Sequence, residues 1–542
     1  MNPGATLAVL IGAGLGLAGL LSTTKRVNEV RSDFEVREQE WEKERAGLQA
    51  QIDEMAFGGS EVAGVESGAA PVDVDREAKL LDQIGFLEEQ LQLTREENKR
   101  LFDRIDSLEL KLSRAGSDPS EAAPLEGSGE VSPGDREIRG KVEELVARIR
   151  KLHWKKAVPH ATADWPTVRE KVEVGLYPSW SDEEWEKKAR AFAALGFMKP
   201  EMDFKKEAAN ILTAQLGASA YVDGEFFFNA DASWRGIYDR ASACLELTQV
   251  LQDQHFNVSA MLEEAKSLDE VVALQSLSIG DAAQVKVRYM LQDNFPTDDD
   301  MRQSLTNLSR QRFDQSPAFV REMFIFPYSA GMRFTQKVYQ KDAWKSLDAA
   351  FANPPRTTSE ILHPELYVDG GFEPEEIALD ASLMRGLEAL DVGTAGELAI
   401  AVLFHQTEFA ERMEELKIED PGEMPVLQDK DFTGTESSEA AKGWRGDSYA
   451  VYPGDDGDHV IWKTRWESAG DAGEFVTLME RTLARRHGVE FDGDASLRRV
   501  ESGFRRITIH INADHGVTVL DAGDADWHEA LAERAGLLLP ES

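Results

Sequence analysis

The chain has 542 residues and carries 99 acidic side chains against 60 basic ones, which gives a formal charge of −39 at pH 7. A surface this acidic repels phosphate backbones, so we expect no nucleic acid among the partners. Cys244 is the single cysteine, which excludes an internal disulfide and a multi-cysteine zinc site.

The first 24 residues contain an uncharged apolar run at 5–21, followed closely by Lys25 and Arg26. The run lies at the short end of the roughly 17–25 residues that span a bilayer. A cleaved signal peptide is the alternative, but no basic segment precedes the run and no clear Ala-x-Ala cleavage site follows it. We therefore predict an uncleaved, single-pass transmembrane anchor at residues 1–24.

Two segments with heptad spacing follow, at 25–56 and 76–114, and Gly/Ser/Pro/acid-rich linkers flank them at 57–75 and 115–135. In the second segment the a and d positions are mostly Leu and Ile, which favours a parallel two-stranded coiled coil, and one Asn at an a position fixes its register. The interface positions are Ile84, Leu87, Leu91, Asn98, Leu101, Ile105, Leu108 and Leu112. We expect a stalk that pairs two copies of the chain.

Helical periodicity dominates residues 136–432. After an amphipathic helix at the start, apolar residues recur with helical spacing in the segments 181–197, 205–217, 237–254, 267–293 and 316–340. Residues 221–231 alternate like two short strands, and Asp223-Gly224 is typical of the tight turn between them. We expect a mainly helical domain with one small hairpin before the helix at 237–254.

Residues 244–256, in that helix, read CLELTQVLQDQHF, and SIGDAA, FPYSAGMRF and PPRTTSEILHPELY follow at 278–283, 326–334 and 354–367. In this order the segments resemble a bacterial group of thermolysin-like (gluzincin) metallopeptidase-like proteins. The key helix of that group reads His-Glu-Leu-Thr-His-Ala-Leu-Gln-Asp-Gln-His-Phe, and a later helix contains Glu-Gly-Asp-Ala. The resemblance extends from about residue 140 to near the C-terminus and includes GWRGDSY at 443–449.

The sequence differs from this family at the positions that bind the metal in the family. In such enzymes two histidines one helical turn apart and a downstream glutamate bind zinc, and the glutamate beside the first histidine is the general base. The matching ligand positions hold Leu245, Gln249 and Ile279. Leucine and isoleucine have no lone pair, and a glutamine amide is a poor zinc ligand. The sequence therefore predicts no zinc, no other cofactor and no hydrolysis, with Glu246 as a vestigial base.

The nearest groups that could rebuild a metal site are Cys244, His255 and Asp281. His255 lies about three helical turns from Leu245, too far for both positions to touch one ion. The resemblance assigns Asp281 to a position behind the ligands, and Cys244 is most simply a small buried apolar residue. We expect no metal site here, and we expect a candidate peptide cleft lined by Glu246, Gln249, His255, Asp281 and Tyr328.

Beyond residue 433 the pattern changes to alternating strands and shorter helices. We expect two strands at 443–468, a helix at 472–488 ending at Gly488, a hairpin at 504–522 and a short helix at 525–536. His510 and His515 fall on a strand and its turn, without a third metal ligand in view.

These patterns predict a mainly α fold: a transmembrane helix and coiled-coil stalk, a helical zincin-like domain over 136–432 and a small C-terminal α+β module over 433–542. The resemblance implies a bacterial inner-membrane protein with an extracytoplasmic soluble part, whereas Lys25 and Arg26 favour a cytoplasmic one. We expect a homodimeric pseudo-metallopeptidase that binds a protein or peptide, or acts as a scaffold. The alternatives are a divergent metal-dependent hydrolase with a relocated site and a structural spacer of an envelope assembly.

Overall fold

The computed structural model describes residues 133–537 with gaps, the longest of which is 293–315. The shorter gaps are 159, 176–179, 216–218, 223, 231, 233, 235, 419–423, 425–426, 428, 456, 494–495 and 504. The chain divides into two compact units, Met1–Glu121 and Ala122–Ser542, and every described residue belongs to the second. The predicted anchor, both coiled-coil segments with all their interface positions and the first linker lie outside the described residues. Within those residues, no helix is both long and apolar enough to cross a membrane.

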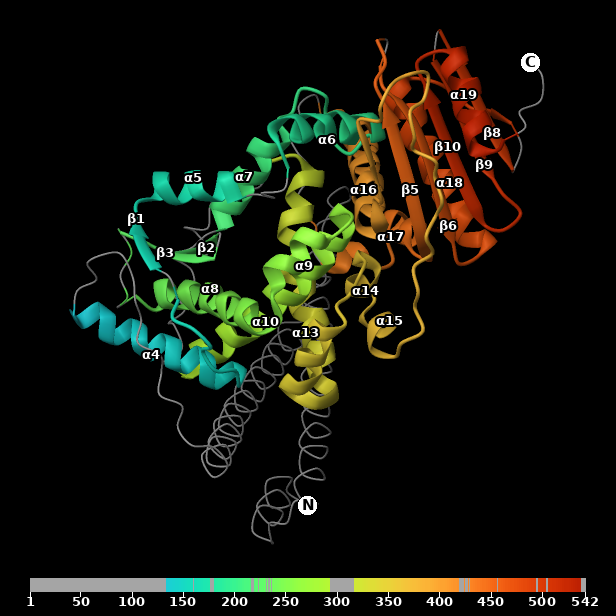
Figure 1. The fold of residues 1–542 in the computed structure, drawn as a ribbon. Helices are drawn as coiled ribbons and strands as arrows, with labels where there is room; N and C mark the ends of the chain where they lie inside the picture. Colours follow the sequence, from blue (N-terminus) through green and yellow to red (C-terminus); the bar gives the residue numbers. More distant parts are fainter. Residues whose placement is uncertain are drawn as a thin grey trace, which may run out of the picture. The chain divides into compact units, whose positions relative to one another are not determined.

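Helices form most of the described chain before the C-terminal sheet, and the long helices α8, α10 and α13 lie at their centre (Figure 1). The helices are α4 (Pro133–Arg150), α5 (Trp165–Gly175), α6 (Asp182–Leu195), α7 (Phe204–Gln215), α8 (Ile237–Phe256), α9 (Val258–Glu264), α10 (Leu268–Gln292), α13 (Ala318–Ala352), α14 (Thr358–Leu362) and α15 (Pro364–Val368). The helical segments expected from periodicity are confirmed, and α13 is broken by non-helical dihedral angles at Asp342 and Ala343, just beyond its expected end at residue 340, before a second helical stretch runs to Ala352.

Local sequence signals set the ends of α6 and α8. The hydroxyl of Ser181 accepts a hydrogen bond from the Glu184 N–H at 3.3 Å, and the Glu184 carboxylate accepts one from the Ser181 N–H at 2.6 Å. This reciprocal pair satisfies two N–H groups that the first turn leaves without helical partners. Gly196 ends α6 with φ 95°, and Asn257 ends α8 with φ 58°, both left-handed conformations that stop a helix.

Two glycines let α10 and α13 cross at very short range. A Cβ atom on Gly280 would overlap the carbonyl of Gly331, and one on Gly331 would overlap the carbonyl of Ser276. These glycines belong to SIGDAA and FPYSAGMRF, two of the segments that carry the family resemblance. Both segments therefore have a packing role that is independent of any metal.

A three-stranded sheet packs beside α8. Strands β2 (Ser219–Val222) and β3 (Glu225–Asn229) form the antiparallel hairpin that Asp223-Gly224 predicts, with Val222 opposite Glu225. Strand β1 (His160–Ala163) runs parallel to β3 and completes the sheet. The hairpin prediction is confirmed, whereas β1 comes from a segment more than 50 residues earlier and carries no comparable local signal.

The C-terminal region is built around a seven-stranded antiparallel sheet in the order β4-β5-β6-β10-β9-β8-β7. Its strands are β4 (Asp391–Gly393), β5 (Trp444–Tyr452), β6 (His459–Trp466), β7 (Asp492–Gly493), β8 (Leu497–Ser502), β9 (Arg505–Ile511) and β10 (Gly516–Ala522). The helices of this region are α16 (Gly396–Glu415), α17 (Glu436–Ala441), α18 (Ala469–His487) and α19 (Ala525–Ala535), with a short 3-10 turn at Asp429–Phe432.

This sheet overturns the expectation of a mainly α fold with a small C-terminal module. The two predicted hairpins, β5–β6 and β9–β10, are present, and β6 pairs with β10 to join them into one sheet. That pairing links residues 51 to 61 positions apart, so no local pattern predicts it. The short strands β4 and β7 and the charged strand β8 lack the apolar alternation by which strands are recognised.

The helical region and the sheet share one apolar core. The Phe197 ring stacks on Phe319 at 4.7 Å between centroids and meets Trp462 of β6 edge-on at 6.0 Å. The helix α18 packs on this face of the sheet through Phe475, and α19 covers the opposite face, where a second cluster includes Trp527. The core thus continues across the expected domain boundary at 432/433.

Candidate functional site

The helix α8 carries two of the three positions that match lost zinc ligands, and α10 carries the third. Leu245 is 7% exposed and Ile279 is 8% exposed, while Gln249 is half-buried. The two helices are joined nearby, because Gln252 Nε2 donates to the Ser278 carbonyl at 3.0 Å and Ser278 Oγ donates to Gln252 Oε1 at 2.6 Å. The two strings that resemble the metallopeptidase motifs therefore lie side by side.

Glu246 is buried against the hairpin strand β2. Its carboxyl accepts a hydrogen bond from the backbone N–H of Tyr221 at 3.1 Å. Burial raises the pKa of Glu246 to about 8, although the Tyr221 N–H and the nearby Lys286 ammonium lower it. Burial also raises the pKa of Tyr328, and the charge of Glu246 adds to that effect. Burial therefore favours the neutral form of the Glu246 carboxyl in the folded chain.

Asp281 is held in a buried ion pair away from any opening. Arg150, at the C-terminal end of α4, donates through Nε to Asp281 at 2.7 Å, and Gln252 donates to the same carboxylate oxygen at 2.8 Å. Neither Arg150 nor Asp281 has exposed surface. The guanidinium also pairs with Asp348 at 2.8 Å and lies over the Trp344 ring at 4.8 Å. The Asp281 carboxylate therefore joins α4 and α8 to α10, and Arg150 extends the contact to α13 through Asp348.

His255 lies at the C-terminal end of α8, away from Glu246. Its Nε2 lies 2.6 Å from the His153 carbonyl oxygen, and the His153 ring meets it edge-on at 5.0 Å. Nine residues separate His255 from Glu246, which corresponds to roughly 13 Å along the helix axis. The structure places Glu246 and Tyr328 near one another, but Asp281 and His255 each belong to separate contacts.

The donor set around α8 does not fit a metal ion. Across the described ranges, no group of three or more His, Cys, Asp or Glu side chains is placed to hold one. Burial raises the pKa of the Cys244 thiol to about 12, so the sulfur stays protonated. His510 lies on β9 and His515 in the turn before β10, and neither belongs to such a group.

A second polar cluster, which the sequence reasoning missed, lies where α16 begins. The Asp447 carboxylate accepts four hydrogen bonds, from the backbone N–H groups of Ala395 and Gly396 at 2.9 and 3.0 Å and from the indoles of Trp444 and Trp462, each at 2.9 Å. The N-terminus of a helix provides just such N–H donors. Asp447 belongs to GWRGDSY, the string already singled out at 443–449.

Two further buried acids surround Asp447. Burial raises the pKa of Asp269 well above its usual range, and Asp447 and Glu397 add to this effect, while hydrogen bonds from Thr358 oppose it. Glu397 lies 2.7 Å from His363 Nε2. Thr358 and His363 come from PPRTTSEILHPELY, so two of the resembling strings meet here. The cluster connects α10, α14, α16 and β5, and all its carboxyls are buried.

The comparisons with known proteins give a match, which lies in the C-terminal region of the chain. A family model described as a domain of unknown function (DUF8575) matches residues 385–532, which include the whole seven-stranded sheet together with α16, α17 and α18. No curated protein and no solved structure matches the chain.

Proposed function

We propose that this chain is a non-catalytic relative of thermolysin-like metallopeptidases that serves as a protein- or peptide-binding scaffold. The observation that carries the proposal is the filled site between α8 and α10. Leu245 and Ile279 are buried there, and the Glu246 carboxyl is bonded to the β2 backbone. Metal-assisted hydrolysis requires metal ligands, which the side chains at 245 and 279 do not provide. It also requires a general base, which the bonded Glu246 carboxyl does not readily provide.

The side-chain chemistry supports the loss of zinc. Hydrocarbon groups at 245 and 279 offer no lone pair, and the amide of Gln249 is a poor ligand beside them. A general base acts through its ionised form, and burial keeps the Glu246 carboxyl largely neutral near pH 7. A scaffold function needs neither a metal nor this base.

An exposed apolar edge supports the binding of a protein partner. Leu383, Leu387 and Val392 are 65%, 42% and 44% exposed, and they lie on one segment that leads into the edge strand β4. Edge strands with exposed apolar neighbours are typical interaction surfaces. We assign partner binding to this edge rather than to the α8 face, because the residues of the expected cleft do not converge there.

The N-terminal segment completes the proposal. The apolar run at 5–21 anchors the chain in a bacterial inner membrane, and the heptads at 76–114 pair two copies. The resemblance favours an extracytoplasmic location for the soluble part. A tethered pair of scaffolds presents two copies of its partner surface near the membrane.

Metal content separates this function from a relocated hydrolase. The full chain is incubated with zinc, desalted and measured by elemental mass spectrometry, beside the variant Leu245→His/Gln249→His/Ile279→Glu. A matched control, Leu245→Ala/Gln249→Ala/Ile279→Ala, changes the same positions without adding ligands. We expect stoichiometric zinc in the histidine–glutamate variant and in neither of the others.

Stoichiometric zinc in the unmodified chain, together with cleavage of a peptide library, would overturn the proposal in favour of a metal-dependent hydrolase. Zinc that binds equally to the alanine control would show that the metal lies elsewhere in the chain, which would also contradict the mapping of the site onto α8 and α10.

A further inference from the structure

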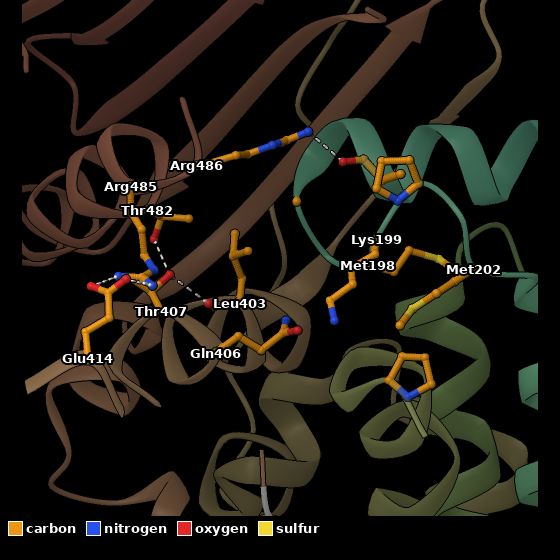
Figure 2. Close-up of a pocket in the computed structure, with 14 residues that line it drawn as sticks. Met198, Lys199, Met202, Leu403, Gln406, Thr407, Glu414, Thr482, Arg485 and Arg486 are labelled. Atoms are coloured by element: carbon orange, nitrogen blue, oxygen red, sulfur yellow. Dashed lines mark hydrogen bonds and ion pairs between the residues drawn. The ribbon is translucent and has the colours of Figure 1, made fainter. Parts of the chain in front are cut away.

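The arginines of α18 are bonded to neighbouring elements. Figure 2 shows two of them beside the pocket between α6, α16 and α18, where both terminal nitrogens of Arg485 bond the Glu414 carboxylate at 2.7 Å. In the same view the terminal nitrogens of Arg486 donate to the carbonyls of Ala194 and Ala193 at 2.6 and 2.7 Å. These guanidinium groups join elements of the fold, so a buried guanidinium that is not used in this way calls for another explanation.

Arg499, on β8, differs from the arginines of α18. Its Nε and Nη2 atoms are buried and have no hydrogen-bond partner among the described residues. These two nitrogens form one edge of the planar guanidinium, the same edge with which Arg190 holds both carboxylate oxygens of Asp458 at 3.3 and 2.5 Å. Buried donors without a partner are rare, because they have lost their hydrogen bonds to water. The unbonded edge of Arg499 therefore suits two oxygens of one anion.

Arg499 lies on the face of the sheet that α19 covers (Figure 1). The strand register places it opposite Thr508 of β9, whose Oγ1 lies 2.9 Å from Nε2 of His528 in α19. Side chains alternate between the two faces of a sheet, so His510, two residues after Thr508, is on the same face. The His510 Nδ1 atom is also buried and has no partner in the described part of the chain. Two diagonal neighbours on adjacent strands thus share unbonded polar atoms on one face.

The electrostatic field on this face is positive, although the chain as a whole carries a formal charge of −39. Burial, together with the charges of Arg499 and Arg506, lowers the pKa of His528 to about 4. Glu501 opposes this effect, but its carboxylate is paired with Arg506 at 3.0 Å. Because Arg506 is neutralised by that pair, the charge of Arg499 is the one that an anion could balance. A local positive field in an acidic protein concentrates small anions.

We propose that Arg499 and His510 form a binding site for a phosphate group, either inorganic phosphate or the phosphate of a small monoester. The Nε–Nη2 edge of Arg499 holds two phosphate oxygens, and His510, in its Nδ1–H tautomer, donates to a third. A tetrahedral group presents oxygens in several directions, which suits donors from two strands, whereas a carboxylate has only two oxygens in one plane. Both sources of the group present at least three free oxygens, which is the feature that this site recognises.

Occupation of this site has consequences for stability. An anion that binds only the folded chain raises the unfolding temperature. Without the anion, Arg499 buries two nitrogens that lack partners, so its replacement by methionine should not lower the unfolding temperature. An arginine that serves only the packing of β8 would give the opposite result. The site lies within residues 385–532, the segment matched as DUF8575, and it does not depend on the scaffold function, since an enzyme or a spacer could hold the same anion.

Thermal unfolding of the purified full chain, in a Bis-Tris propane chloride buffer at constant ionic strength, tests the proposal with inorganic phosphate, glycerol phosphate and acetate as probes. The variants are Arg499→Met and His510→Phe, and the matched control is Arg412→Met, which removes an exposed arginine of α16. We expect saturating phosphate to raise the unfolding temperature of the unmodified chain and of the control by about 3 °C, and that of Arg499→Met by less than about 1 °C. In isothermal titration calorimetry, His510→Phe should bind phosphate about tenfold more weakly.

Three results would overturn the proposal. The first is the absence of a phosphate-dependent rise in the unfolding temperature of the unmodified chain. The second is a full rise in Arg499→Met, which would leave this arginine with a structural role alone. The third is acetate that stabilises the chain as much as phosphate does, because the site would then not select a tetrahedral anion. Tighter binding of glycerol phosphate than of inorganic phosphate would support the proposal with a monoester as the ligand, and the reverse would support it with the free anion. None of these results changes the zinc measurement, so the two proposals fail separately.

Discussion

Two buried carboxyl groups, in two regions of the molecule, differ in how well they are bonded. Glu246, in the helical region, accepts one hydrogen bond from the described residues, at 3.1 Å from the Tyr221 N–H. Asp447, in the sheet region, accepts four, at 2.9–3.0 Å. Burial raises the pKa of both groups, but the four donors at Asp447 each favour its ionised form. The group that matches a catalytic base is thus the less supported of the two.

This difference indicates where the fold depends on polar contacts. At Asp447 the donors come from the first turn of α16 and from two indoles, so one side chain joins a helix to the sheet. At Glu246 the adjacent Leu245 is a buried hydrocarbon side chain, and the carboxyl accepts a hydrogen bond from the Tyr221 N–H near the Lys286 ammonium. Two strings that resemble motifs of one family therefore hold carboxyl groups with very different numbers of hydrogen-bond donors.

The largest effect is expected at Asp447. Asp447→Ala leaves two backbone N–H groups and two indole N–H groups buried without their acceptor, so we expect the free energy of unfolding to fall by about 4 kcal/mol. Urea denaturation followed by tryptophan fluorescence measures this change. The exposed Asp455→Ala is the control, with an expected change of at most about 0.5 kcal/mol. Similar losses in both variants would contradict the structural role of Asp447.

The next largest effect is expected at the helix crossing in the first region. Gly331→Ala places a methyl group against the Ser276 carbonyl, so α10 and α13 must move apart, at an expected cost of about 3 kcal/mol. Gly473→Ala, in α18, is the control, because a Cβ there meets no atom within 4 Å. We expect that control to stabilise α18 slightly, since alanine is the better helix former. Thermal unfolding distinguishes the two, and a neutral Gly331→Ala would rule out the tight crossing.

A smaller and pH-dependent effect is expected at Glu246. Its pKa rises from an ordinary value of about 4.5 to about 8 on folding, so the folded chain binds this proton more tightly than the unfolded chain does. The stability associated with it is therefore fully present below pH 4.5 and is lost as pH rises toward 8. Glu246→Gln removes this loss, so its stability relative to the unmodified chain should improve by about 2 kcal/mol between about pH 6 and about pH 8.

Urea denaturation at both pH values measures this difference. Glu143 and Glu322, whose pKa values burial also raises to about 7, are present in both chains and cancel in the comparison. A difference between the two chains that does not change with pH would mean that Glu246 is ionised in the folded state, and would restore it as a candidate base.

The smallest effect is expected at the surface ion pair between α16 and α18. Glu414 is mostly exposed, so Glu414→Gln should change the free energy of unfolding little, and less than any of the substitutions above. High salt should reduce even this difference, because counterions screen exposed charges. A loss comparable to that of Asp447→Ala would show that this surface pair holds α18 to α16 as strongly as the buried acid holds α16 to the sheet.

The sequence alone determined features that depend on neighbouring residues or on side-chain chemistry. Asp223-Gly224 predicted the turn between β2 and β3, Gly488 predicted the end of α18, and helical periodicity predicted α8, α10 and α13. Leu245 and Ile279 cannot bind zinc in any fold, because their side chains carry no lone pair. Such features are local or intrinsic to a residue type, so a single chain read in order reveals them.

Tertiary structure decided what depends on segments far apart in the chain. The pairing of β6 with β10, the ion pair between Arg150 and Asp281, and the hydrogen bond from Arg486 to the Ala194 carbonyl join residues that are separated by 51–61, 131 and 292 positions. Tertiary packing decides which hydrogen-bond donors surround a carboxyl group. Those donors decide whether the carboxyl is a general base, a structural contact between elements or a neutral buried acid. That is why the sequence named Glu246 and passed over Asp447, although both lie within strings that it had singled out.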